Sequence, residues 1–225
     1  TSCDKDDDND SATSVIAGGV LSGEVVGLGD ANPDSINATM YYYDENNAFN
    51  VDGSYNDKIV VGSGTLDDGE LTLNDKIVVG SGTLADGELT LKLNETVDER
   101  YLEAGFKELE EEYGGKITVS NRNVKIGEAD VRAYQSGKAI GQFYYVTGIE
   151  DKDWHGYLIY AAAVVSITGT YTDEEGNGRV IYNVFLKKGW NIVYMKETGT
   201  EGHRYYEYTT ATPSGAKWYY KDDTL

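Results

Sequence analysis

Alternation of apolar and polar positions dominates this chain and predicts β-strands along most of its length. Strands are expected at residues 23–28 and 36–43, with a polar turn between them at 30–34. Beyond residue 116 the pattern predicts further strands, at 117–120, 140–146, 157–170, 205–210 and 217–220. The 157–170 stretch fits one long strand or two consecutive ones. With 27 glycines and only 2 prolines, the composition is also typical of a mainly β protein with glycine turns.

Two consecutive segments of 18 residues are almost identical. Residues 56–73 read NDKIVVGSGTLDDGELTL and residues 74–91 read NDKIVVGSGTLADGELTL, so only Asp67 and Ala85 differ. Each copy predicts a hairpin, because a strand pattern is followed by an Asp-Gly turn and a return strand. Because 18 is an even number, insertion of one copy leaves every later side chain on the same face of the sheet. We therefore predict that one copy lies in the core of the sheet while the other extends or loops from its edge.

One α-helix is expected, over residues 98–113. Its apolar positions recur at spacings of three and four and share one face, at Leu102, Phe106, Leu109 and Tyr113. Gly114 and Gly115 are expected to end it. This amphipathic helix should pack on a sheet and connect two β regions.

The clearest hairpin of the second half is expected at residues 180–195, with a turn at Lys187-Lys188-Gly189. Both faces of its first strand are largely apolar. Together these patterns predict a mainly β fold of two sandwich-like antiparallel β halves connected by the helix. The expected organisation is a tail at 1–14, a β region with the tandem hairpins at 15–97, the helix at 98–114 and a second β domain at 115–225.

The strongly negative net charge of the chain disfavours negatively charged partners. The 225 residues carry a net charge of −20, and such a field repels the phosphate backbone of nucleic acids. It also disfavours broad adhesion to anionic lipid headgroups. The longest apolar stretch, residues 157–170, is shorter than the roughly 20 residues that a membrane-spanning helix needs. We expect no nucleic-acid partner.

Cys3 is the only cysteine, so neither an intrachain disulfide nor a cysteine-based metal site can form. The acidic run DKDDDND follows it and is expected to stay solvated and extended. Two interpretations are open: Cys3 is a lipid attachment site, or it is a free thiol in a loose tail. We favour the lipid anchor because exposed free cysteines are generally avoided. Two or more acyl chains on this residue would hold the protein stably on a membrane.

Catalytic signatures are almost absent. The sequence has no nucleophile elbow, phosphate-binding loop or zinc-protease motif. His155 and His203 lie 48 residues apart in polar loops, and a metal site would need them to converge with carboxylates. Among 39 acidic residues, carboxylate pairs that could serve a glycosidase are expected by chance, as at Asp151/Asp153 and Glu174/Glu175. We expect no catalytic residue, no metal and no cofactor.

Aromatic side chains gather in the second half of the chain. All three tryptophans and 12 of the 19 tyrosines follow residue 140. Aromatic residues favour strands, which accounts for most of this clustering, but aromatic faces can also form platforms for sugar rings. Trp154, beside His155 in an expected loop, is the best candidate for ligand contact, whereas Trp190 and Trp218 fit strand patterns.

Several short segments carry a family resemblance: residues 186–191 (LKKGWN), Val193-Tyr194, residues 217–219 (KWY), residues 22–25 (SGEV) and Tyr101-Leu102. They resemble surface lipoproteins of Bacteroidetes whose function is unknown. Residues 1–3 (TSC) resemble the end of a bacterial lipoprotein signal peptide, and the acidic run resembles the surface-export signal of that group. The resemblance implies an outer-membrane anchor at Cys3, exposure to the cell exterior and a β-sandwich. It implies no catalytic residue.

The expected function is that of a cell-surface lipoprotein acting as a non-enzymatic binding or accessory module, with glycans as candidate ligands. A structural or adhesive surface protein that assembles through β-edge pairing is the alternative. A hydrolase with an unrecognised carboxylate or histidine site is the third class. The expected partners are a membrane, through the lipid on Cys3, and a carbohydrate or another surface protein.

Overall fold

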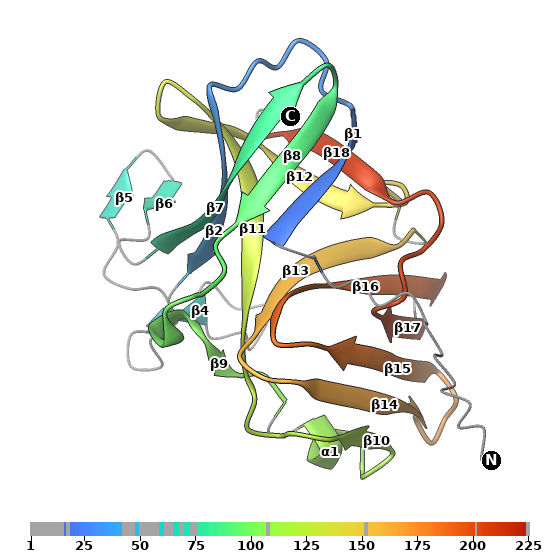
Figure 1. The fold of residues 1–225 in the computed structure, drawn as a ribbon. Coiled ribbons are helices and arrows are strands. Elements are labelled where there is room, and N and C mark those ends of the chain that lie inside the picture. The colour runs from blue at the N-terminus through green and yellow to red at the C-terminus, as the bar shows by residue number, and fades with distance from the viewer. Residues whose placement is uncertain are drawn as a thin grey trace, which may run out of the picture.

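The computed structural model describes residues 16, 19–41, 48–49, 59–60, 65–67, 70–72, 76–106, 109–150, 153–200 and 202–223. Over these residues the protein is mainly β, as the sequence predicts, with one short α-helix, α1 (Leu109–Glu112). Most strands belong to one continuous sheet of 14 strands (Figure 1). Cys3 and the acidic run lie outside the described residues, so the lipid anchor stays a prediction. In the described part, no helix has the length and apolar character needed to cross a membrane.

Eight strands of this sheet close into a barrel. In order around the ring they are β13 (His155–Ala161), β12 (Lys138–Val146), β18 (Lys217–Asp222), β1 (Val20–Val26), β8 (Glu88–Leu93), β7 (Lys76–Ala85), β2 (Ser35–Tyr41) and β11 (Lys125–Gln135). β1 and β18 are parallel, and the other neighbours in the ring are antiparallel. The barrel thus combines four strands from each side of the 94–124 segment.

β11 closes the ring by changing partners half-way along its length. Residues 126–129 pair with β13, whereas residues 131–135 pair with β12. β12 and β13 pair with each other only at Tyr145 with Gly156 and at Val146 with His155. A notch therefore opens on the outer surface where the three strands diverge.

The barrel interior holds the larger of two hydrophobic clusters. Every second residue of a strand points inward, as the alternation predicts. Fully buried members include Met40, Val79, Leu89, Leu91, Tyr194 and Trp218. Aromatic rings fill much of the volume, with Trp218 edge-on to both Phe143 and Tyr145.

β13 also belongs to a second, open sheet. Beyond it come β16 (Gly189–Thr200), β17 (His203–Thr209), β15 (Gly178–Leu186), β14 (Val165–Thr172) and β10 (Ile117–Val119). The inner face of this sheet joins the barrel cluster, and its outer face carries a second cluster that includes Ile159, Ile167 and Val184. A barrel and an open sheet that share β13 therefore stand where two sandwich-like halves were expected. The difference arises because β11 pairs with both β12 and β13, which closes strands from both expected halves into one ring with no free edge.

The 180–195 hairpin was predicted correctly as two strands with a turn, but wrongly as a pair. The chain does turn at residues 187–189, where the Asn191 side chain bonds both backbone groups of Lys187. β17 then inserts between the two strands, parallel to β15 and antiparallel to β16. Alternation identifies a strand but carries no information about its neighbour.

The prediction of one helix over residues 98–113 is wrong. The segment contains a short 3₁₀ turn (Glu99–Tyr101), the two-residue strand β9 (Glu103–Ala104) and then α1. Leu102 is buried in the barrel cluster, whereas Phe106, Leu109 and Tyr113 pack on the outer cluster of the open sheet. A single helix would place all four on one face, yet they cover two different cores. Gly105, whose own position is crowded by Ile126, lies where the chain passes from one to the other.

The two copies of the duplicated segment have different positions. The second copy forms β7 and β8 of the barrel. In the first, β5 (Thr65–Asp67) pairs with β6 (Glu70–Thr72) outside the 14-stranded sheet (Figure 1). The register is the same in both, since Leu66 faces Leu71 as Leu84 faces Leu89. β4 (Ile59–Val60), also in the first copy, pairs with β3 (Ala48–Phe49).

Candidate functional site

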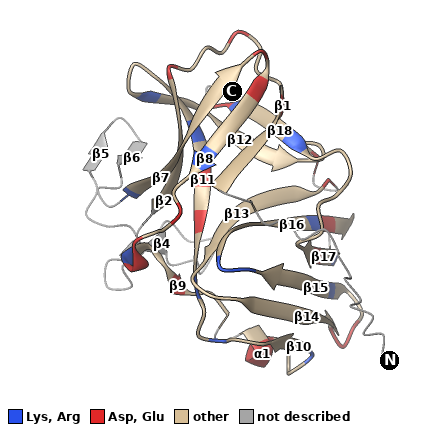
Figure 2. Cartoon of the chain, in the orientation of Figure 1, with Lys and Arg blue, Asp and Glu red and all other residues tan. Residues whose placement is uncertain are grey.

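The outer face of the open sheet carries an apolar groove of about 320 Å³. Its floor comes from β13, β16, β15 and β17, and the chain just before and within α1 forms one wall. Floor and wall residues include Tyr157, Val193, Met195, Tyr182, Tyr208 and Phe106. The middles of β14 and β15 carry few charges, which lie mainly at the strand ends (Figure 2). The described residues cover this face only in part and leave the groove between them.

Strand alternation places the groove residues. On β16, Ile192 and Tyr194 point into the barrel cluster, which leaves Val193 and Met195 on the outer face. On β15 and β17, Tyr182 and Tyr208 are direct cross-strand partners. Their rings stack with centroids 4.7 Å apart and planes 7° from parallel.

Tyr113, which follows α1, packs against this aromatic floor. Its ring is tilted against Tyr171, at 5.2 Å between centroids, and against Tyr182, at 6.2 Å. Burial raises the pKa of the Tyr208 hydroxyl to about 12, and it raises the pKa of Tyr182 as well. Both hydroxyls therefore remain protonated at neutral pH and can donate hydrogen bonds.

Glu128 marks the end of the groove and the beginning of the notch beside it. It lies on β11 opposite Ile159 of β13, which makes Tyr157 its diagonal neighbour on the same face. Burial against these strands, with a smaller effect of the Asp130 charge, raises the pKa of Glu128 to about 7, although part of the side chain stays open to solvent. The carboxyl can therefore both donate and accept hydrogen bonds near neutral pH.

The notch between β11, β12 and β13 has a volume of about 120 Å³ and a more polar lining. It shares Glu128 and Tyr157 with the groove and adds Asp130, Gln142 and His155. The Gln142 amide donates to Asp130 Oδ1 at 3.2 Å. Burial raises the pKa of Asp130, against the opposing effects of the Arg132 charge and of this hydrogen bond.

A third hollow, of about 380 Å³, continues from the notch across β12 and β18. The two share Tyr144, Val146 and His155, and the third hollow adds Tyr219 and Lys221. Neighbouring hollows share lining residues and therefore adjoin one another, and we call the three together the furrow. It runs from the Tyr182–Tyr208 stack, past Glu128, to Tyr219.

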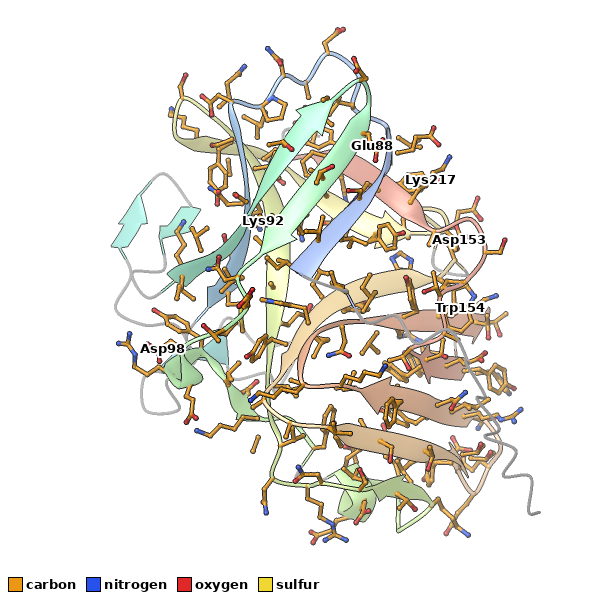
Figure 3. All side chains as sticks on the ribbon, viewed as in Figure 1. Glu88, Lys92, Asp98, Asp153, Trp154 and Lys217 are labelled. Carbon is orange, nitrogen blue, oxygen red and sulfur yellow. The ribbon has the colours of Figure 1, made fainter. Side chains whose placement is uncertain are left out.

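Of the two residues that the sequence predicts to contact a ligand, His155 lines the furrow and Trp154 does not. His155 lines the notch and the third hollow, and its Nε2 lies 3.2 Å from the carbonyl oxygen of Glu150. Trp154 precedes β13 (Figure 3) but lines none of the three hollows. Its indole is half-buried against the barrel cluster, and Lys196 Nζ lies 5.7 Å from the ring centroid. The Trp154 ring is therefore partly covered.

The other polar candidates are not brought together. His203 begins β17, whereas His155 begins β13, and Glu174 and Glu175 lie in the turn between β14 and β15. Asp151 lies outside the described residues, and Asp153 accepts a hydrogen bond from the backbone of Glu150. Within the described ranges, no group of three or more histidines, cysteines or acids is placed to hold a metal ion.

Sequence reasoning missed the central residues of the furrow, Glu128, Tyr157, Tyr182 and Tyr208. The run 126–134 (IGEADVRAY) does alternate small or apolar residues with polar ones, which would have placed Glu128 and Asp130 on one outer face. The tyrosine stack gave no such signal, because β15 and β17 are brought together only by the parallel insertion.

Comparison with protein-family models, with curated proteins and with solved structures found no match.

Proposed function

We propose that this protein is a non-enzymatic carbohydrate-binding module and that the furrow is its binding site. The observation that carries the proposal is the junction at Glu128 and Tyr157, where an aromatic groove meets a polar notch. Sugar rings present apolar faces that stack on aromatic side chains. Their hydroxyl groups suit carboxyl and amide partners such as Glu128, Asp130 and Gln142.

The acidic lining of the notch favours an uncharged glycan. Glu128 and Asp130 are acidic, and the whole chain carries −20. A uronic or sulfated sugar would place a second negative charge near these carboxyls, which costs binding free energy. The elongated shape favours a chain of several sugar units over a single one.

Attachment to the outer surface of a bacterial outer membrane, through acyl chains on Cys3, is part of the same proposal. The sequence of residues 1–10 supports it. Mass spectrometry of the protein from its native membrane is expected to find acylated Cys3. Unmodified Cys3 in that material would contradict the anchor without affecting the binding site.

A glycan array followed by calorimetry tests the binding site. The protein is expected to bind neutral oligosaccharides, and Tyr208→Ala is expected to weaken binding by about fivefold, since one aromatic stacking contact contributes on the order of 1 kcal/mol. Tyr205→Ala on the same strand is the control, because this exposed ring is absent from the lining of the furrow. No binding to any glycan at millimolar concentration would refute the proposal.

Two further readouts separate the alternatives. Trp154→Ala tests the residue favoured by the sequence: a loss of binding with this variant, but not with Tyr208→Ala, would move the site away from the furrow. Recovery of the intact oligosaccharide after long incubation is expected of a binding module. Its cleavage, abolished by Glu128→Gln, would instead identify a hydrolase.

A structural or adhesive role is the second candidate, and the hairpin of β5 and β6 favours it. Over the described residues these strands pair only with each other, so both outer edges are open to a partner strand. Light scattering would show concentration-dependent assembly that disappears when residues 56–73 are deleted. A monomer at all concentrations would argue against this role.

A further inference from the structure

β7 has a near-identical second version elsewhere in the chain. Residues 58–67 (KIVVGSGTLD) match β7 (KIVVGSGTLA) at every position but the last. That position, Ala85, is exposed in the barrel, so an aspartate is compatible with it. We call residues 58–67 the spare strand.

The spare strand meets the steric conditions of the β7 position. Val79 is fully buried there, and Gly80 and Gly82 allow close approach of neighbouring chains. A Cβ on Gly80 would lie 2.7 Å from the Lys92 carbonyl oxygen, and one on Gly82 would lie 2.9 Å from Ile36 Cγ2. The spare strand supplies valine and the same two glycines at the corresponding positions, 61, 62 and 64.

β8 has no equivalent replacement. Its last two residues, Lys92 and Leu93, lie outside the repeat, and the first copy continues with Asn74 and Asp75 instead. Leu93 is only 3% exposed and lies directly opposite Gly80. A first copy in the β8 position would therefore bury a carboxylate where the core requires a leucine. This difference explains why the second copy forms the hairpin of the barrel.

We propose that the spare strand can replace β7 in the barrel of the same molecule while β8 stays in place. The segment between them, residues 68–87, then becomes an outward connection. Every buried side chain of the barrel is retained in this exchanged form, because Val61 takes the place of Val79 and Leu89, Leu91 and Leu93 do not move.

Chain geometry permits the exchange. β2 and β7 are antiparallel neighbours, with Tyr41 opposite Lys76, so the chain between them only has to return to an adjacent position. Residues 42–75 make this connection in the structure, and residues 42–57 would make it in the exchanged form. Loop closure depends only weakly on length, so this transfer of residues costs little. The exchange loses the Asp86-Gly87 turn, whose φ values of 52° and 77° fit a tight hairpin. It also breaks the short pairings of β4 with β3 and of β5 with β6. These losses make the exchanged form the minor one in the unmodified protein.

Damage to β7 should make the exchanged form dominant. Val79→Asp is expected to keep a cooperative thermal transition with Tm lowered by only a few degrees, since a modest loss of stability shifts Tm by about 2–4 °C in a chain of this size. Leu91→Asp, an equally buried position on β8, is expected to abolish the transition. Val61→Asp alone should leave Tm unchanged, and Val61→Asp combined with Val79→Asp should prevent folding.

Deletion of residues 56–73 provides the decisive control. Without the spare strand, Val79→Asp is expected to unfold the chain. If Val79→Asp unfolds the full-length protein as Leu91→Asp does, or if the deletion variant tolerates Val79→Asp equally well, the exchange does not occur. Size-exclusion chromatography checks the pathway: rescue is expected in a monomer, and rescue confined to a dimer would refute replacement within one molecule.

Discussion

The two faces of β13 and β16 are both apolar, yet only one of them is sealed. On the inner face, Leu158, Tyr160 and Ile192 are buried by the barrel that closes over them. On the outer face, Tyr157 and Val193 are only half-buried, because the chain around α1 covers part of the sheet and leaves the groove. Apolar character alone therefore does not distinguish a core from a binding surface. What distinguishes them is the extent of the cover.

Substitution of adjacent residues on β16 tests this comparison most directly. Ile192→Ala is expected to lower the free energy of unfolding by about 2–5 kcal/mol, because it leaves a cavity in a closed core. Val193→Ala, one residue further and on the opposite face, is expected to cost about 1 kcal/mol or less, since its site is already partly open. Urea denaturation of both variants measures the difference. Equal losses would mean that the outer face is as completely packed as the inner one.

The sequence predicted the strands of both faces but not how they are covered. Alternation is a local property, and it places strands near residues 20–26, 138–146 and 203–209 well. Closure of the barrel through β11 and insertion of β17 are contacts between residues far apart in the chain. The local pattern of apolar and polar residues does not predict these long-range contacts.

The missing helix shows the same limit in another form. Spacings of three and four at Leu102, Phe106 and Leu109 are what a helix would show, but here these residues reach two separate cores. Tertiary burial overrides the periodic pattern, because each side chain gains more by covering its own cluster than by sharing a helix face. The furrow depends on this same segment as its wall, so the sequence could not define the site either.

The tyrosine stack offers a second, smaller test of the comparison. Tyr182 and Tyr208 are expected to show a coupling of about 0.5–1.5 kcal/mol in a double-mutant cycle of unfolding, typical of an aromatic pair. On a functional surface, each single change to alanine should reduce glycan affinity more than it reduces stability. If stability falls while binding is unaffected, the stack belongs to the core and not to the site.

The smallest expected effect is a pH dependence specific to the outer face. The pKa of Glu128 is raised to about 7 in the folded protein, from an ordinary value of 4.5. Between these values the folded state holds a proton that the unfolded chain has released, so stability falls as pH rises from about 4.5 to 7. Because the side chain is partly solvated, this contribution should stay below about 1 kcal/mol. Glu128→Gln removes the titration and should flatten this part of the profile of Tm against pH.

The control for this titration is Glu88→Gln, at an exposed carboxyl on β8 (Figure 3). The profile of Tm against pH of Glu88→Gln is expected to follow that of the unmodified protein, because this variant keeps Glu128 and all the other acids of the chain. Glycan affinity should be compared across the same pH range. If Glu128 donates to a sugar hydroxyl, affinity falls as pH rises through 7. If its carboxylate accepts from the ligand, affinity rises over the same range, and an affinity independent of pH would mean that Glu128 does not touch the ligand. The comparison therefore distinguishes a carboxyl that only lies at the rim of the open face from one that contacts the ligand.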